Sequence, residues 1–283
     1  MIRRQFMGVV LAALLCSGCA VLPRGDWPPE TGGVPPQREL TSVPFHPQDE
    51  YQCGPAALAM ALGWSGLDVQ PAELTEKVYT ASLQGSLPPA MIAGARRSGR
   101  FAYVISGTEA LIREIAAGHP VIVLQNLGLS WAPLWHYAVV VGYDIPADEI
   151  ILHTGRKARD RTAMGVFQAT WSRAGAWGLL VLKPGELPAT AREADVVEAA
   201  LGLEKARQPA AAAQSYQAAL SRWPQNLPAM MGLGNSYYAL GDLQNSERAF
   251  RRATETPPES GVAFNNLAHV LLSVGRREEA LSA

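Results

Sequence analysis

A repeat with a period of 34 residues runs through the C-terminal third of this chain and limits the folds that this part can adopt. Five pairs of like residues recur at this spacing: Tyr216 and Phe250, Ala219 and Ala253, Pro224 and Pro258, Leu233 and Leu267, and Gly241 and Gly275. A repeat of this length forms one helix–turn–helix unit, and each unit buries its apolar face only by stacking on a neighbour. We therefore predict an all-α solenoid over residues 193–283, with units that begin near residues 193, 227 and 261.

The repeat resembles the tetratricopeptide family. Seven residues stand where that family expects them: Leu233, Gly234, Tyr237, Gly241, Phe250, Ala253 and Pro258. Ser246 replaces the usual alanine. The resemblance implies that this region binds a protein or peptide partner.

The N-terminus has the features of a secretion signal. Arg3 and Arg4 precede an apolar stretch that is too short to cross a bilayer with ordinary flanks, which is typical of a signal peptide over residues 1–18. The sequence LCSGC resembles a bacterial lipobox with Cys19 as the acylated residue, although Cys16 stands where that motif usually has leucine. The alternatives are an uncleaved anchor or an ordinary secreted protein.

The lipobox resemblance also implies a location. Ala20 rather than aspartate follows Cys19, which favours the outer membrane, with the protein facing the periplasm. Residues 19–42 are rich in proline and glycine, and we expect them to form a tether between the lipid and the folded part.

Charge and cysteine content narrow the functions further. The net charge is -1, and lysine and arginine form no basic stripe, which argues against nucleic acid as a partner. Once Cys16 and Cys19 are assigned to the signal and the lipid, Cys53 remains alone. A single cysteine in an oxidising compartment is either a reactive thiol or a small buried apolar residue.

Residues 43–184 alternate helical and strand patterns. Helices are expected at 53–62, 72–79, 91–98 and 108–117, and strands at 121–125, 137–143, 149–153 and 178–182. Helices that come first and strands that follow predict an α+β domain.

The segment HPQDEYQCGPAALAMAL carries the clearest chemical signal. Cys53 stands where a loop enters a helix, and the helix dipole there is expected to lower the pKa of its thiol. Gly54 leaves room beside the sulfur. The side-chain amide of Gln48 is a candidate donor to an oxyanion, and Gln52 is a second candidate, although hydrogen bonding within the loop is an alternative role for both.

A cysteine nucleophile also needs an acid and base, which is most often histidine. His136 opens the strand HYAVVVGYD and is the candidate that we favour over a core role. The other four histidines are His46, His119, His153 and His269.

Together these motifs resemble the papain-like cysteine peptidases that process bacteriocin double-glycine leaders, and their free-standing lipoprotein relatives. The matching elements are Q-x-x-x-x-C-G-P-A-A, the stretch GTEALIREIAAGHPVIVL and the sequence HYAVVVGY about 80 residues after the cysteine, and they cover residues 43–183. The resemblance implies a papain-like fold with Cys53 as nucleophile, His136 as general acid and base, and Gln48 in the oxyanion hole.

One position departs from the family. An aspartate usually stands near the end of the strand that follows the histidine, but this strand reads EIILHTG. His153 and Thr154 are therefore candidates for the third member of the site, with Asn126 next in line.

We expect a cysteine peptidase that hydrolyses a peptide or protein substrate, with the repeats as a binding surface. A non-catalytic, lipid-anchored adaptor is the main alternative, and acyl transfer by the same dyad is a third possibility. We expect no cofactor and no metal, because no cluster of histidine, cysteine and carboxylate residues has ligand spacing.

Overall fold

The computed structural model describes residues 24–28, 33–48, 52–256 and 260–282. The expected signal peptide and the acylated Cys19 lie outside the described residues. Within the described ranges, no helix is long and apolar enough to cross a membrane.

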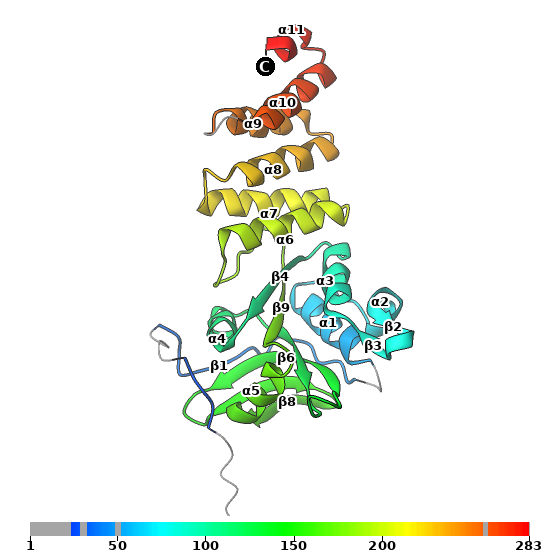
Figure 1. The fold of residues 1–283 in the computed structure, drawn as a ribbon, viewed down its shortest axis with the longest axis vertical. Coiled ribbons are helices and arrows are strands. Elements are labelled where there is room, and N and C mark those ends of the chain that lie inside the picture. Colours follow the sequence, from blue (N-terminus) through cyan, green and yellow to red (C-terminus); the bar gives the residue numbers. More distant parts are fainter. Residues whose placement is uncertain (1–23, 29–32, 49–51, 257–259, 283) are drawn as a thin grey trace, which may run out of the picture.

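The first domain is built on a seven-stranded antiparallel sheet (Figure 1). Its main path has the order β4-β9-β5-β6-β7-β8, and β1 pairs with the far end of β6. The strands are β1 (Gln37–Glu39), β4 (Phe101–Ser106), β5 (Val121–Asn126), β6 (Trp135–Asp144), β7 (Glu149–Thr154), β8 (Lys157–Ala163) and β9 (Trp177–Leu182). The side hairpin of β2 (Tyr79–Thr80) and β3 (Gly85–Ser86) flanks η1 (Ala81–Leu83).

Five helices complete this domain: α1 (Cys53–Trp64), α2 (Pro71–Val78), α3 (Pro88–Arg97), α4 (Thr108–Ala117) and α5 (Met164–Ser172). The first helix is buried from Gly54 to Leu62 and packs on β5, β6 and β9. Alanine-rich composition allows this burial, because small side chains let α1 approach the sheet closely. The nucleophile candidate therefore begins a helix that is fixed in the core.

The predicted α+β class and the eight predicted helices and strands of this domain are confirmed, with shifts of a few residues at their ends. The sequence patterns missed β4, β8 and α5. The strand β8 reads KARDRTA and is an exposed edge strand, so it lacks the apolar alternation that predicts strands.

The range 19–42 expected for the tether includes residues that belong to the folded domain. Residues Gln37–Glu39 form β1, and Trp27 packs against the core while its indole N–H donates to Asp148 at 2.7 Å. The C-terminal end of β6 extends past the start of β5, so its backbone groups on that side can pair with β1. No pattern in the sequence indicates this pairing, which is why the sequence predicts a tether that reaches residue 42.

The second region is the predicted all-α stack, which rises from the sheet in Figure 1. Its helices are α6 (Glu193–Lys205), α7 (Pro209–Arg222), α8 (Leu227–Ala239), α9 (Leu243–Thr254), α10 (Gly261–Ser273) and α11 (Arg277–Ser282). Any side chain at Gly232 or Gly234 would clash with the ring of Tyr216 or Phe250, respectively. Glycine at these positions thus lets the repeated aromatic residues pack closely between helices.

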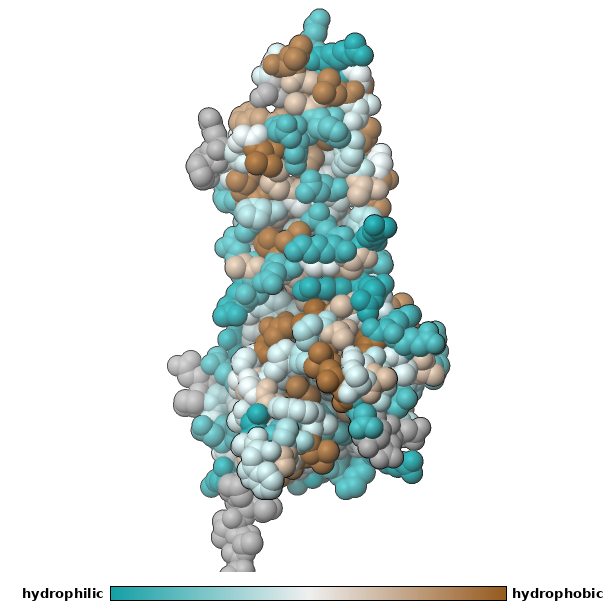
Figure 2. Space-filling view, turned by 45° about the vertical axis from the view of Figure 1, so that its right-hand side comes forward, coloured by the Kyte–Doolittle hydropathy of each residue, from teal (hydrophilic) through white to brown (hydrophobic). Residues whose placement is uncertain are grey.

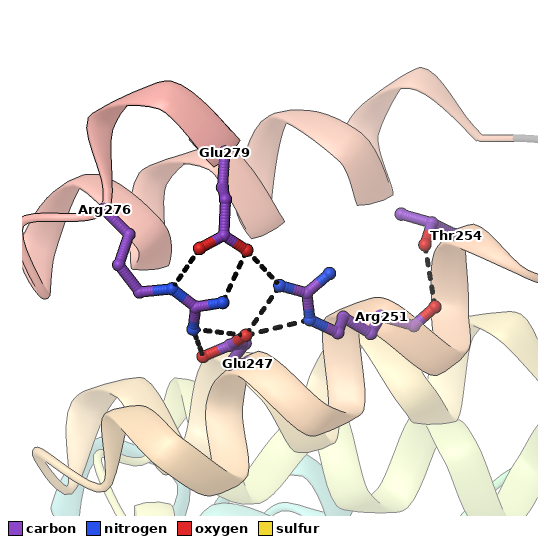
Figure 3. Close-up of polar contacts among 5 residues, drawn as sticks. All are labelled: Glu247, Arg251, Thr254, Arg276 and Glu279. Carbon is purple, nitrogen blue, oxygen red and sulfur yellow. Dashed lines mark hydrogen bonds and ion pairs between the residues drawn. The ribbon is translucent and has the colours of Figure 1, made fainter. Parts of the chain in front are cut away.

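Polar contacts join the last two turns of the stack. Glu247 on α9 accepts hydrogen bonds from Arg251 and from Arg276, each at 2.8 Å, and Glu279 on α11 bonds to both arginines (Figure 3). Because Arg251, Arg276 and Glu279 are about half exposed, the network orients α11 more than it stabilises the fold.

The two regions share one hydrophobic core. Buried residues of the sheet and of the first repeats, such as Phe101, Leu203 and Tyr216, belong to a single cluster. The linker between them is fixed by Glu114 of α4, a fully buried carboxylate that accepts from the backbone N–H of Thr190 at 2.7 Å and from that of Ala189 at 3.1 Å.

Candidate active site

Cys53 is the first residue of α1, and its thiol lies against the start of β6. The backbone N–H groups of Tyr137, Gly54 and Cys53 itself lie close enough to the sulfur to lower the pKa of the thiol. The thiol is free and partly buried. Because the N–H of Tyr137 belongs to the peptide that joins it to His136, the fold brings Cys53 and His136 together across 83 residues of sequence.

Burial sets the protonation state of both groups. It raises the pKa of the Cys53 thiol, and the backbone hydrogen bonds that lower this pKa do not offset it. The expected lowering by the helix dipole is therefore wrong for the free site, because the sulfur loses more hydration than the helix end returns. Burial also lowers the pKa of His136. The resting pair is a neutral thiol beside a neutral imidazole.

Thr154 orients the His136 ring. The Nε2 atom of His136 lies 2.7 Å from Oγ1 of Thr154, at the end of β7. Since this contact occupies Nε2, the other ring nitrogen, Nδ1, is the one that can exchange a proton with the sulfur. Thr154 thus takes the place expected for the third member of the site.

His153, the other candidate, does not contact His136. Neighbouring residues of a strand point to opposite faces, and His153 is turned away from the site. Its Nε2 donates to the carbonyl of Val43 at 3.2 Å, and its Nδ1 accepts from the backbone N–H of Arg159 at 3.1 Å. The ring is 3% exposed and packs edge-on against Phe45, and burial lowers its pKa. Its role is structural.

Gln48 is fixed beside Tyr137, the residue whose backbone N–H faces the Cys53 sulfur. Its Nε2 donates to the carbonyl of Tyr137 at 3.1 Å, and its Oε1 accepts from the backbone N–H of Gly155 at 2.9 Å. The second N–H of this amide has no hydrogen-bond partner among the described residues. The side chain is therefore buried beside Tyr137 and holds a donor in a fixed position, as an oxyanion site requires.

The remaining polar candidates have other partners. Gln52 precedes α1, and its Oε1 accepts from the hydroxyl of Thr75 at 3.0 Å. Asn126 fixes the loop between β5 and β6, since its Oδ1 accepts from the backbone N–H groups of Gly128 and Leu134, each at 3.0 Å.

Two other histidines also have roles away from Cys53. The Nδ1 of His119 lies 2.7 Å from Glu114, and the ring of His269 packs against Tyr238 in the repeats.

Two residues of the site's wall were not singled out from the sequence. Ser86 of β3 lies so close to Gly54 that any side chain at Gly54 would clash with it. The hydroxyl of Tyr137 donates to the carbonyl of Ser86 at 3.1 Å. A two-residue strand carries no periodic signal, so only the tertiary structure reveals this wall.

The rim next to His136 is apolar. The loop that leads from β5 into β6 exposes its large side chains, and Trp131 is 82% exposed. The exposed residues of this segment are Leu127, Leu129, Trp131, Leu134 and Trp135. Figure 2 shows that hydrophobic residues also gather in patches on one face of this domain and of the stack. Among the described residues, no group of three or more His, Cys, Asp or Glu side chains is placed to hold a metal ion.

Comparisons with known proteins match each of the two regions to a family. Residues 34–178 match the Peptidase_C39 like family, and residues 197–261 match the tetratricopeptide repeat. A search of curated proteins found no match.

Three solved structures are similar to the first domain. A C39-like peptidase from Bacillus anthracis is 19% identical over 52% of this chain and 98% of its own, with a TM-score of 0.44. The peptidase domain of Streptococcus ComA, a bifunctional ABC transporter involved in quorum sensing, is 25% identical over 50% of this chain and 99% of its own, with a TM-score of 0.43. A double glycine motif protease from an AMS/PCAT transporter, in complex with a leader peptide, is 19% identical over 51% of this chain and 96% of its own, with a TM-score of 0.38.

Proposed function

This chain belongs to the Peptidase_C39 like family of cysteine peptidases, and on that premise we propose that it is a lipid-anchored envelope enzyme that cleaves a peptide bond through Cys53 and His136. The observation that carries the proposal is the contact of the Cys53 sulfur with the His136–Tyr137 peptide, with Thr154 on the far nitrogen of the histidine.

The reaction proceeds in two halves. The Cys53 thiol gives its proton to Nδ1 of His136, and the sulfur attacks the substrate carbonyl while Nε2–H donates to Thr154. The free N–H of Gln48 receives the oxyanion. The imidazolium then protonates the leaving amine, which breaks the peptide bond and leaves a thioester on Cys53. Water attacks the thioester with His136 as base, and the carboxylate product leaves with the thiol restored.

Substrate binding is expected to activate the pair. A neutral thiol and a neutral imidazole are the resting forms, because burial raises the pKa of Cys53 and lowers that of His136. Proton transfer between them becomes favourable when a bound carbonyl presents an electrophile and Gln48 stabilises the product of attack. The apolar rim from Leu127 to Trp135 supports a peptide substrate, since it borders the histidine directly.

The membrane part of the proposal depends on the sequence up to residue 20. Cys19 follows a signal-like apolar stretch, and Ala20 favours the outer membrane, with the enzyme facing the periplasm. Labelled fatty acid should mark the protein, and Cys19→Ala should abolish the label. A label that persists on that variant would refute the anchor and leave the peptidase proposal intact.

Catalysis is tested with a peptide pool and mass spectrometry. Cleavage should disappear in Cys53→Ala and in His136→Ala. In the free protein, alkylation of Cys53 by iodoacetamide should accelerate only toward alkaline pH, with an apparent pKa above the ordinary value of about 8.5. Added amine acceptors that capture the acyl group would identify acyl transfer instead of hydrolysis.

A non-catalytic adaptor is the second candidate, because Thr154 supplies no negative charge to the His136 imidazolium. In that case the pool would remain uncut while a protein partner still binds to the repeats. The repeats are proposed to bind that partner, or the substrate itself, in either case.

A further inference from the structure

A cavity of about 740 Å³ lies at the junction of the peptidase domain and the repeats, apart from Cys53. Its floor is the second half of β4, and the start of α4 forms one wall. Linker residues 189–192 form the opposite wall, and Arg222 at the end of α7 closes one side. Figure 1 shows the elements concerned, with β4 at the edge of the sheet directly below α6.

The floor of this cavity is an open strand edge. The backbone N–H of Gly107 donates to Ala176, which continues the ladder between β4 and β9. Because an antiparallel strand alternates its hydrogen-bonding direction, Tyr103 and Ile105 face β9, and the N–H and C=O groups of Val104 and Ser106 face outward. These outward groups have no partner among the described residues. Strand edges of this kind pair readily with an added chain.

The walls are fixed before any ligand arrives. The hydroxyl of Tyr103 donates to the carbonyl of Thr190 at 3.3 Å and accepts from the backbone N–H of Arg192 at 3.2 Å. The buried carboxylate of Glu114 holds Thr190 from the other side. A preformed space of this size reduces the entropy lost on binding.

The cavity has an excess of positive charge. Arg113, Arg192 and Arg222 line it, together with one carboxylate, Glu109. Arg113 pairs with Glu109 and Arg192 pairs with Asp195, so the positive charge open to a ligand is centred on Arg222. The guanidinium of Arg222 lies 5.1 Å from the ring of Trp223 and has no ion pair among the described residues. The first-turn N–H groups of α4, from Thr108 to Ala110, also lack partners within the described ranges, and helix N-termini favour anions.

We propose that this cavity binds an extended peptide segment that carries a carboxylate. The segment adds a strand to the outer edge of β4, and its carboxylate lies between Arg222, Arg113 and the start of α4. The open edge from Val104 to Ser106 spans roughly 10 Å, which suits a contact of three to four residues. The carboxylate belongs either to a chain terminus or to an acidic side chain, which share the same chemistry.

Binding is measured with the full chain carrying Cys53→Ala, so that the result is independent of the proposed hydrolysis. The probe is a fluorescein-labelled octapeptide of alternating threonine and valine with one glutamate and a free C-terminal carboxylate. Three companions replace the glutamate by glutamine, the terminus by an amide, or both. The companion that loses affinity identifies the source of the carboxylate, and the doubly neutral peptide should bind at least about tenfold more weakly.

Variants locate the site. Arg222→Glu should weaken the acidic probe by about tenfold or more, whereas Arg277→Glu, an equal charge change on exposed α11, should alter it by less than about twofold. Bound probe should slow amide hydrogen exchange at Val104 and Ser106, while the amides of Tyr103 and Ile105, already paired with β9, stay unchanged.

Three results would overturn the proposal. One is equal weakening by the two arginine variants, which indicates unspecific charge attraction. Another is unchanged exchange at Val104 and Ser106 with the probe bound, which excludes strand addition. The third is the failure of every carboxylate probe to saturate the protein at millimolar concentration.

Discussion

At the scale of single residues, the Thr154 hydroxyl orients the His136 imidazole, while burial sets the protonation of the dyad. It holds Nε2 of His136 at 2.7 Å without a negative charge of its own. The imidazolium that forms during the reaction is therefore stabilised by one neutral acceptor, and burial disfavours it further.

Variants at position 154 should separate orientation from charge. Thr154→Ser should keep turnover near the starting value, and Thr154→Ala should lower it about threefold to tenfold, the kinetic equivalent of one net hydrogen bond. Thr154→Asp should raise the pKa of His136 and increase thiol alkylation at pH 7, by about tenfold for each pKa unit gained.

Position 153 is the control, because His153 is buried away from the dyad. His153→Gln should lower the melting temperature without shifting the pH profile of alkylation. Equal profiles for all the variants at position 154 would exclude Thr154 as the orienting group.

At the scale of elements, close packing of α1 against β3 sets the position of the sulfur. Gly54 follows Cys53 directly, and a Cβ added there would lie 2.6 Å from Cβ of Ser86 and closer still to its hydroxyl. Such a contact cannot be relieved by a change of rotamer alone, because Ser86 Cβ is fixed to the backbone of β3.

Gly54→Ala should therefore destabilise the protein by about 1–3 kcal/mol and misplace Cys53. The added change Ser86→Gly should restore much of the stability and the alkylation rate, whereas Ser86→Ala, which retains the clashing Cβ, should not. Chemical denaturation and iodoacetamide kinetics measure the two effects. Full rescue by Ser86→Ala would assign the clash to the hydroxyl alone.

The contact between α4 and the linker should depend on pH. Burial alone would raise the pKa of Glu114, but hydrogen bonds from His119 and Thr190 outweigh it and leave this pKa lowered. A lowered pKa in the folded state means that Glu114 stabilises the fold above its unfolded pKa of about 4.3, and that this stability is lost as the pH falls through the folded pKa.

Glu114→Gln should cost about 2–3 kcal/mol at pH 7, because its amide would face the N–H groups that the carboxylate now accepts. The difference from the unsubstituted chain should shrink below pH 4. Glu109→Gln, an exposed carboxyl on the same helix, should change the melting temperature little at any pH. A difference that is constant with pH would exclude the carboxylate charge as its cause.

At the scale of the whole molecule, the repeats complete the core of the peptidase domain. Buried residues on both sides of the linker form one cluster, and the guanidinium of Arg96 on α3 packs against Gly202 of α6. The composition change near Pro184 marks the boundary between the two regions, and we expect them to unfold as one cooperative unit because they share a core.

A chain that ends at residue 184 should consequently melt at a lower temperature than the full chain, because it exposes Phe101 and its neighbours in the core cluster. A chain that ends at residue 226 keeps α6 and α7 and should retain most of the lost stability. Equal melting temperatures for the full chain and the chain that ends at 184 would show that the domain folds independently.

Local patterns were sufficient for much of this protein. The 34-residue period determined the helical stack, and apolar runs such as Val121–Asn126 predicted most of the sheet, because both signals arise from side chains close in sequence. The Cys-Gly-Pro entry into α1 and the strand start at His136 likewise predicted the two residues that the fold brings together.

Features that depend on contacts between distant segments followed only from the tertiary structure. It placed Thr154 rather than His153 against His136, since the strand pairing and face of β7 set which side chain points inward. Burial, which a sequence does not quantify, reversed the expected shift in the pKa of Cys53. The cavity over the open edge of β4 exists only because the linker and Arg222 of the repeats wall it. Patterns along the chain thus specify the helices, the strands and the candidate catalytic residues. Long-range packing determines which residues these contact, how they are protonated and where a cavity forms.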